Sequence, residues 1–255
     1  MSAPGGARAS VRTPKYYRRL AAYEAADPWA HAMADWSFHL IKKYSVQIEA
    51  AALLDLGCGA GGFVERFRSN ARVRIGLDID RTALQVAAQR GSAVFGLAAA
   101  ERLPISDASV DVITSHDVLQ HAPAGAFSEA ARALRPGGLL VVRTAARRGL
   151  LWKKHLDSDD YRQWTPDELR RLCEESNLEV RLLTRANWLP SLARDLAALF
   201  REERPQGDVG LPPPPQDANW KQALLRLYWR TERKLALLGF RSPWGHSLLL
   251  AATRK

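Results

Sequence analysis

Cysteine is scarce in this sequence, and no long uncharged apolar run occurs in it. Its two cysteines, Cys58 and Cys173, are too few and too far apart for a disulfide framework or a zinc site. No apolar stretch reaches the roughly 18 residues that a membrane-spanning helix needs. Residues 1–13 are small, polar and basic, without the apolar segment of a secretory signal. We therefore expect a soluble cytoplasmic protein with a disordered tail at residues 1–13.

The composition is sufficient for one α/β domain. Hydrophobic residues make up 47% of the 255 residues, and eight tryptophans argue against global disorder. The formal net charge of +10 raises the question of an anionic partner, which would be a nucleic acid, a membrane surface or an acidic substrate. The excess is mostly arginine scattered through predicted helices, and no aromatic-basic RNA-binding module is recognisable. Nucleic acid is therefore not the partner that we expect.

Short apolar runs alternate with helical patterns through most of the chain. Strands are predicted at residues 51–56, 72–77, 93–97, 110–114, 139–144, 178–183 and 246–252. Helices are predicted between them at residues 62–69, 81–90 and 125–134, and after a capping box at Thr165–Glu168. This alternation predicts a Rossmann-like α/β fold, with a mostly parallel seven-stranded sheet and helices on both faces.

Two helical segments lie outside the alternation, within one domain at residues 14–255. Residues 14–50 are rich in aromatics and predict an N-terminal helical cap. Residues 185–244 separate the last two strands and predict a helical insertion, because so long a segment is too long for a plain loop. Residues 218–238 of it are amphipathic and basic. Four roles are open for this helix. It packs on its own domain, or it covers an apolar acceptor as a lid, or it forms a dimer contact, or it contacts a membrane surface.

A glycine-rich loop follows the first predicted strand. Glycines there allow a tight turn and a close approach of the backbone to a ligand at a helix N-terminus. Gly57, Gly59 and Gly62 also satisfy the dinucleotide fingerprint G-x-G-x-x-G. Asp78, at the end of the second predicted strand, fits either cofactor class, because a carboxylate there accepts hydrogen bonds from two ribose hydroxyls. The loop alone therefore leaves NAD open as a ligand.

Five motifs in order are far more specific than the loop. They are Leu54-Asp55-Leu56-Gly57-Cys58-Gly59, Gly76-Leu77-Asp78-Ile79-Asp80, Ala100-Glu101-Arg102-Leu103-Pro104 with Ser109-Val110-Asp111-Val112-Ile113, Asp117-Val118-Leu119-Gln120-His121, and Leu134-Arg135-Pro136-Gly137-Gly138. In these motifs the chain resembles the seven-stranded, class I S-adenosylmethionine-dependent methyltransferases of the bacterial small-molecule type. The resemblance disfavours a dehydrogenase and implies S-adenosyl-L-methionine as the cofactor.

The resemblance also implies roles for the residues of the first two motifs. Gly57 and Gly59, on either side of Cys58, would let the backbone approach the methionine part of the cofactor. Asp55 would orient the ammonium group of the cofactor through water. Asp78 would hold its ribose.

The adenine side of the site is implied in the same way. Ile79 would pack on the adenine ring, and the turn at Ala100 and Glu101 would meet its edge. In the family an aspartate often precedes that turn, whereas this chain has Ala99. His116 would line the cofactor pocket.

Methyl transfer to a hydroxyl or an ammonium group also requires a general base. His121, just past the fourth predicted strand, is the first candidate because the pKa of histidine suits proton transfer near neutral pH. The alternative is that His121 packs structurally against the cofactor loop. His116 and Asp117 are nearby, but no third or fourth ligand accompanies them, so we expect no metal site.

Substrate contacts are expected from the segment between the fifth strand and the capped helix. His155, Tyr161 and Trp164 lie there, in a region that closes over the acceptor in the enzymes that the chain resembles. The alternative is a solvated loop, because three aspartates crowd the segment. Tyr16 and Tyr17 of the cap cover the cofactor or pack in the core.

These observations predict S-adenosylmethionine-dependent methyl transfer to a small, hydrophobic acceptor, at oxygen. Methylation of tRNA or rRNA is one alternative, motivated by the charge. A cofactor-binding relative without activity is another. The sequence leaves the acceptor and the choice between a monomer and a homodimer open.

Overall fold

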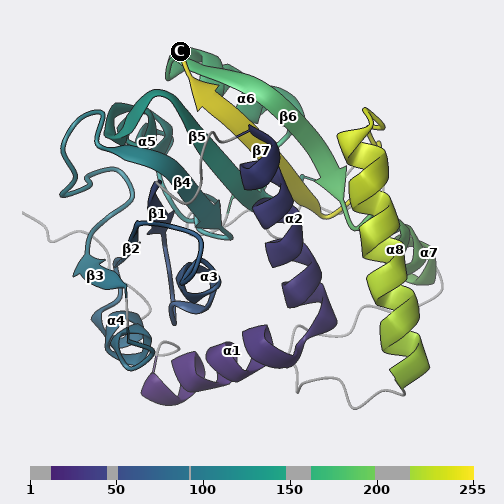
Figure 1. Cartoon of the computed structure of the whole chain (residues 1–255). Helices are drawn as coiled ribbons and strands as arrows, with labels where there is room; N and C mark the ends of the chain where they lie inside the picture. The colour runs from purple at the N-terminus through teal and green to yellow at the C-terminus, as the bar shows by residue number, and fades with distance from the viewer. Residues whose placement is uncertain (1–12, 45–50, 92, 148–161, 199–218) are drawn as a thin grey trace, which may run out of the picture.

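The structure is a computed structural model that describes residues 13–44, 51–91, 93–147, 162–198 and 219–255. Its seven strands are β1 Ala52–Leu56, β2 Val73–Asp78, β3 Val94–Leu97, β4 Val110–His116, β5 Leu134–Ala145, β6 Leu178–Ala186 and β7 Ser247–Arg254. They form one sheet in the order β3-β2-β1-β4-β5-β7-β6 (Figure 1). The neighbours from β3 to β5 pair in parallel, whereas β7 pairs antiparallel with both β5 and β6. The predicted mostly parallel seven-stranded sheet is confirmed.

Helices cover both faces of the sheet. They are α1 Pro14–Ala26, α2 Pro28–Tyr44, α3 Gly62–Glu65, α4 Arg81–Ala88, α5 Gly125–Ala133, α6 Pro166–Glu175, α7 Trp188–Ala198 and α8 Asn219–Leu237. One core cluster joins the sheet to α5 and α6, and a second joins its other face to α2 and α8. Leu53 and Leu54 are both fully buried, one in each cluster, as in a central parallel strand. No helix of the described residues combines the length and apolar character needed to cross a bilayer.

The N-terminal helical cap consists of two helices. Asp27 has an extended backbone between them (φ −78°, ψ 124°), as expected for the residue before a proline. Pro28 begins α2, and the Asp27 carboxylate accepts a hydrogen bond from the Ala30 N–H at 2.9 Å. This break turns α1 across the edge of the sheet, against α3 and α4 (Figure 1). Residues 1–12 of the predicted tail lie outside the described residues.

The Pro136–Gly138 segment is not the helix-closing turn that its sequence suggests. The helix α5 ends at Ala133, and β5 begins at the next residue and runs through the segment. Leu134 pairs with Val110 and Leu139 with Val112, so the extra residues of β5 bulge out between these two pairs. The segment with Pro136 and Gly137, whose φ is 77°, therefore forms a bulge within β5 and not the end of α5. The predicted strand start at residue 139 is five residues too late.

The insertion packs on its own domain through one face of α8. The indole N–H of Trp229 donates to the Asn187 side-chain oxygen at 2.8 Å. The backbone N–H of Trp188 donates to the Glu232 carboxylate at 3.0 Å. Trp229 and Glu232 are both buried. These bonds join α8 to Asn187, just after β6, and to the start of α7. Trp229 and Ala236 of α8 also belong to the core cluster of α2 and the sheet, so this face of the helix packs on its own domain.

Candidate functional site

The loop after β1 requires glycine because of its backbone conformation. Gly57, Gly59 and Gly61 have φ values of 76°, 53° and 77°. A Cβ atom at Gly57 would lie 2.0 Å from the Val118 Cγ2 atom. The N–H of Gly57 donates to the carbonyl of Leu77 at 2.7 Å, which holds the loop against the end of β2. A side chain at Gly57 would break this packing.

Asp78 holds the glycine loop and the next turn together. One carboxylate oxygen accepts a hydrogen bond from the Gly59 N–H at 2.8 Å, and the other accepts from the Asp80 N–H at 2.9 Å. Asp80 in turn caps α4 and accepts a hydrogen bond from the Tyr17 hydroxyl at 2.8 Å. The buried Tyr17 therefore fastens α1 to the same end of the sheet.

A pocket of about 480 Å³ lies between the loop and the N-terminal cap. Six of the residues predicted from the sequence line it: Asp55, Gly57, Cys58, Gly59, His116 and His121. The cap contributes Tyr16, Leu20, Tyr23, Glu24, Ala25, Trp29, Ala30 and Ala34. The structure thus brings the glycine loop, the end of β4 and the cap around one space at the carboxyl ends of the strands, where open α/β sheets bind ligands.

Other predicted residues lie outside this lining. Asp78 and Ile79 are next to the glycine loop, and the Ile79 side chain is 65% exposed. Ala100 and Glu101 sit in a tight turn in which the Arg102 N–H donates to the Ala99 carbonyl at 3.1 Å. Their predicted contacts with adenine stay predictions.

Of the three predicted substrate residues, Trp164 lies within the described residues, and it does not line the pocket. His155 and Tyr161 lie outside the described residues. Trp164 is 1% exposed, contacts the Phe127 ring, and donates from its indole N–H to the Leu119 carbonyl at 3.3 Å. The structure therefore places Trp164 in the core under α5, because its large apolar ring is buried there with its polar atom satisfied. This overturns its prediction as a residue open to the acceptor.

Asp55 and His116 are buried titratable groups in the lining of the pocket. Asp55 accepts a hydrogen bond from the Thr114 hydroxyl at 2.7 Å, yet burial raises the pKa of Asp55 to about 7. His116 bonds with the Ser37 hydroxyl at 2.8 Å, and burial holds the pKa of His116 well below its ordinary value. His116 is therefore neutral at neutral pH and acts as a polar wall of the pocket. Within the described residues, no three metal-binding side chains gather.

Sequence reasoning missed Glu24. Its Oε2 atom is buried and has no hydrogen-bond partner among the described residues, and burial raises the pKa of Glu24. A Cβ atom at Gly62 would lie 2.4 Å from that oxygen, so the carboxyl group reaches the glycine loop. No local pattern distinguishes this glutamate from a solvated helical residue. Only the docking of α1 places it in the pocket.

The fold also brings together Arg143 of β5 and Asp117, which directly follows β4. The two side chains form a salt bridge at 2.5 Å, and the Arg143 guanidinium lies 4.8 Å from the centre of the Trp29 ring. Asp117 has a left-handed φ of 56°, which turns the chain after β4 toward Val118 and His121. The lining of the pocket therefore contains both acidic and basic side chains. Such a lining suits a ligand that carries a positive and a negative group.

Comparisons with known proteins agree with this geometry. Residues 54–142 match the family model described as a methyltransferase domain. They form a class I S-adenosylmethionine-dependent methyltransferase domain. The resemblance to the class I S-adenosylmethionine-dependent methyltransferases is confirmed, and the cofactor of this domain is S-adenosylmethionine. The pocket fits that cofactor, because Asp55 and the orphaned Glu24 oxygen offer acceptors to a cationic group.

One curated relative is a malonyl-[acyl-carrier protein] O-methyltransferase of Marinomonas sp. (strain MWYL1), with 31% identity over 52% of this chain and 53% of that protein. The chain thus spans about half the length of such relatives. A Haloferax volcanii chain solved with the Trm112 methyltransferase activator is 20% identical over 95% of this chain and 97% of its own, with a TM-score of 0.58. The [4+2]-cyclase SpnF is 21% identical over 89% and 82%, with a TM-score of 0.58. At these identities the two structures show a shared fold alone.

Proposed function

We propose that this protein transfers a methyl group from S-adenosylmethionine to a small, hydrophobic acceptor, at oxygen. The observation that carries the proposal is that the glycine loop and His121 line the same pocket. When bound, the cofactor supplies a methyl group on a sulfonium, so the protein chiefly has to align the acceptor for an in-line displacement. An acceptor at oxygen agrees with the name of the Marinomonas relative, an O-methyltransferase. Leu20, Trp29 and Phe63 give the pocket apolar walls, which suit a hydrophobic acceptor.

The residues around the loop would bind the cofactor. Gly57 and Gly59 would bring the loop backbone close to the cofactor, and Asp78, which already orders the loop, would accept hydrogen bonds from ribose hydroxyls. Asp55 and Glu24 would face the cationic end of the cofactor, since both are buried acids on the pocket wall. Burial strengthens such charge interactions because it removes competing water.

His121 would act as the general base. Its side chain is exposed at the pocket wall, on the turn where its backbone N–H donates to the Val118 carbonyl at 2.8 Å. His116 is unsuited to the role, because its lowered pKa leaves it a weak base. Asp117 is engaged by Arg143. The exposed position of His121 at the pocket wall makes it the candidate among these three for the proton of an acceptor hydroxyl.

Calorimetry and a methyl-transfer assay test the proposal. S-adenosylhomocysteine should bind to the purified protein, whereas NAD should not. A panel of phenols, catechols and acyl carboxylates, incubated with labelled S-adenosylmethionine, should yield a methylated product, and polar amines should yield none. Binding of NAD without binding of S-adenosylhomocysteine would overturn the cofactor, and methylation of RNA alone would overturn the acceptor. Cofactor binding with no product in any class would favour a non-catalytic relative.

Cofactor affinity should depend on pH through Asp55. Its pKa is raised to about 7, so the carboxyl group is protonated below that pH in the free protein. A cationic ligand favours the carboxylate, so binding releases a proton, and the dissociation constant should rise as the pH falls from 7.5 to 5.5, by at most about tenfold per pH unit for one group. Calorimetry in two buffers of different ionisation enthalpy measures the released proton. Asp55→Asn should flatten the dependence, and an unchanged profile in that variant would exclude Asp55 as its source.

Glu24→Gln should weaken binding of S-adenosylmethionine about tenfold, because it removes the charge of a buried acceptor. The matched control is Glu175→Gln, which alters an exposed carboxylate on α6 that pairs with Arg171. Titration of each variant with S-adenosylmethionine and with S-adenosylhomocysteine separates the two cationic groups. An equal loss for both ligands indicates the ammonium group, and a loss confined to the first indicates the sulfonium. No loss for either ligand would remove Glu24 from the site.

A further inference from the structure

The outer face of α8 carries an apolar stripe that the fold does not use. Trp220, Leu224, Leu227, Leu235 and Leu238 are 62%, 56%, 61%, 40% and 85% exposed. These residues recur every three or four positions, except where Thr231 interrupts them, so they lie on one side of the helix. The side opposite to this stripe is the one that packs on the domain.

Large apolar residues are also exposed beyond the end of the helix. Phe240 and Trp244, in the turn between α8 and β7, are 50% and 54% exposed. Single exposed apolar residues are ordinary on a soluble protein, but a contiguous group of large ones marks an interaction site. Tryptophan and phenylalanine at the end of a leucine stripe are typical of helices that lie at a membrane interface.

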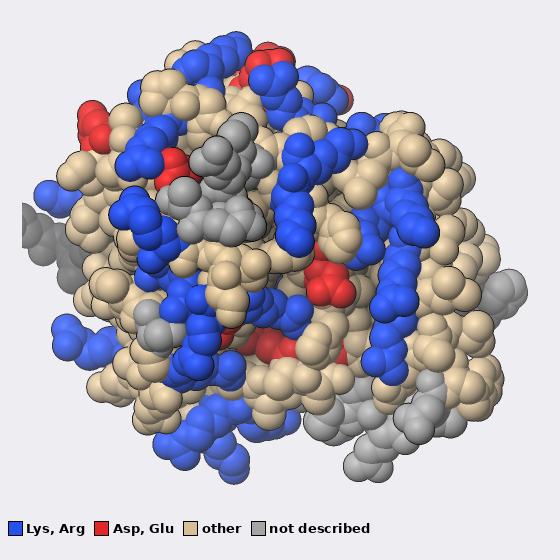
Figure 2. All heavy atoms as spheres, viewed as in Figure 1, with Lys and Arg blue, Asp and Glu red and all other residues tan. Residues whose placement is uncertain are grey.

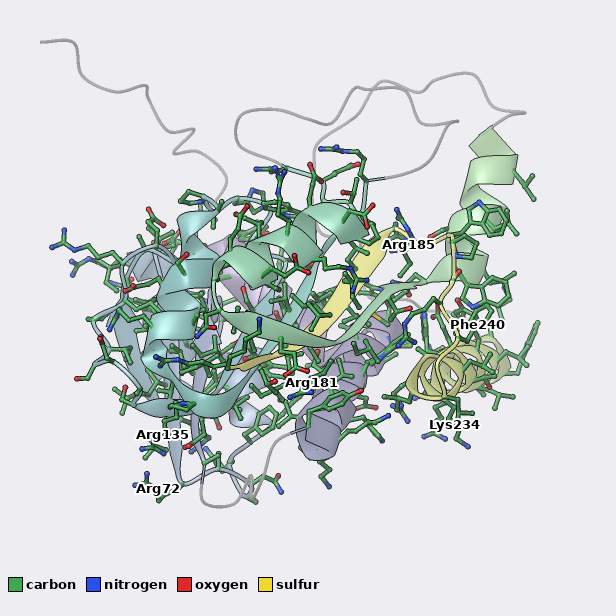
Figure 3. All side chains as sticks on the ribbon, turned by 90° about the horizontal axis from the view of Figure 1, so that it is seen from above. Arg72, Arg135, Arg181, Arg185, Lys234 and Phe240 are labelled. Atoms are coloured by element: carbon green, nitrogen blue, oxygen red, sulfur yellow. The ribbon has the colours of Figure 1, made fainter. Side chains whose placement is uncertain are left out.

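Positive charge borders the stripe. Arg226, Arg230 and Lys234 are exposed on one side of it, and within the described residues none of the three forms a salt bridge. The one acidic residue of α8, Glu232, is buried on the opposite side of the helix. Figure 2 shows the resulting column of Lys and Arg along α8, with uncharged residues beside it. In Figure 3, Lys234 points away from the sheet.

We propose that the outer face of α8, defined by the five stripe residues and their basic border, docks on an anionic membrane surface. Apolar side chains would enter the region between headgroups and acyl chains, and the cations would pair with anionic headgroups. A second copy of the chain is the poorer partner, because it would bring like charges together along the stripe. A nucleic acid would pair with the cations but would leave the leucines without a partner. The proposal does not depend on methyl transfer.

Vesicle co-sedimentation tests the docking. The full chain should bind vesicles of phosphatidylcholine with about one third phosphatidylglycerol, and it should bind pure phosphatidylcholine far more weakly. Arg226→Gln/Arg230→Gln/Lys234→Gln should lower the partition coefficient on the order of 100-fold, because each basic residue near an anionic surface contributes about fivefold. Leu224→Ser/Leu227→Ser should lower it by a similar factor, on the order of 100-fold, because two leucines lose their apolar contact.

A charge-matched control distinguishes binding through the outer face of α8 from an effect of the net charge of the protein. Arg72→Gln/Arg135→Gln/Arg181→Gln removes three cations that lie away from α8 (Figure 3) and should keep vesicle binding within about threefold. Near-ultraviolet circular dichroism of each variant verifies that the fold is intact. Equal binding to both vesicle types, or an equal loss in the control, would overturn the proposal. A dimer that dissociates on Leu224→Ser/Leu227→Ser, with no vesicle binding by the parent chain, would overturn it as well. So would α8 substitutions that weaken only RNA binding.

Discussion

Gly57→Ala is expected to weaken cofactor binding at least 100-fold. The new Cβ atom would lie 2.0 Å from the Val118 Cγ2 atom, and it would sit on a residue with a φ of 76°. Relief of the clash must displace either the loop or the turn after β4, and both line the pocket. Two displaced walls would cost several hydrogen bonds, and a loss of about 3 kcal/mol corresponds to roughly 150-fold in affinity. Calorimetric titration with S-adenosylhomocysteine measures the effect.

Gly137→Ala is the matched control. Gly137 has a φ of 77°, almost equal to that of Gly57, but a Cβ atom there would meet nothing within 4 Å. Both variants carry the conformational cost of an alanine in the left-handed region, about 1–2 kcal/mol of stability. Only Gly57→Ala carries the clash. Equal cofactor affinity in the two variants would show that the close approach of Val118 to the loop does not control binding.

His121→Ala is expected to lower kcat on the accepted substrate about 100-fold, the lower end of the effect of removing a general base. The dissociation constant for S-adenosylhomocysteine should change less than about threefold, because the residue lies at the wall of the pocket beyond the glycine loop. The pH profile of kcat distinguishes a base from a packing residue. Its acidic limb should be present in the parent enzyme and absent in the variant.

The variant His121→Gln distinguishes a role of the side chain in packing from a role in proton transfer. Glutamine fills a similar volume and keeps hydrogen bonding but cannot accept the proton. A variant that regains the parent rate would show that His121 positions the acceptor or supports the loop. A loss of cofactor affinity in both variants would place His121 in structural packing, which the sequence analysis left open.

The glycine loop and its partners could be predicted from the sequence because their geometry is local. Gly57, Gly59 and Asp78 lie at the ends of adjacent parallel strands, and parallel strands align their carboxyl ends at one edge of the sheet. The spacing of the motifs therefore predicted both the fold class and the centre of the pocket. The second of these strands ends at Asp78, as predicted.

Other parts of the site depend on segments far apart in the chain. Glu24 enters the pocket because the break at Asp27 and Pro28 turns α1 over the loop, and Tyr17 holds it there through Asp80. Trp164 is buried because the packing of α5 leaves a space for its ring. Neither outcome follows from local pattern, since an amphipathic helix or an aromatic residue near a loop is compatible with several partners.

The helix α8 shows most clearly the difference between what the sequence determines and what the tertiary structure decides. The sequence by itself determined that residues 218–238 form a basic helix with apolar residues and that this helix is inserted before the last strand of a mostly parallel seven-stranded sheet. It also determined that a cofactor loop follows β1, because these features depend on periodicity and on short spacings. Only the tertiary structure decided which side of the helix faces the domain. Trp229 and Glu232 bond to the two residues that follow β6, so the leucines on the other side of α8 stay exposed to solvent. Periodicity defines faces, but burial depends on contacts between residues that are distant in sequence.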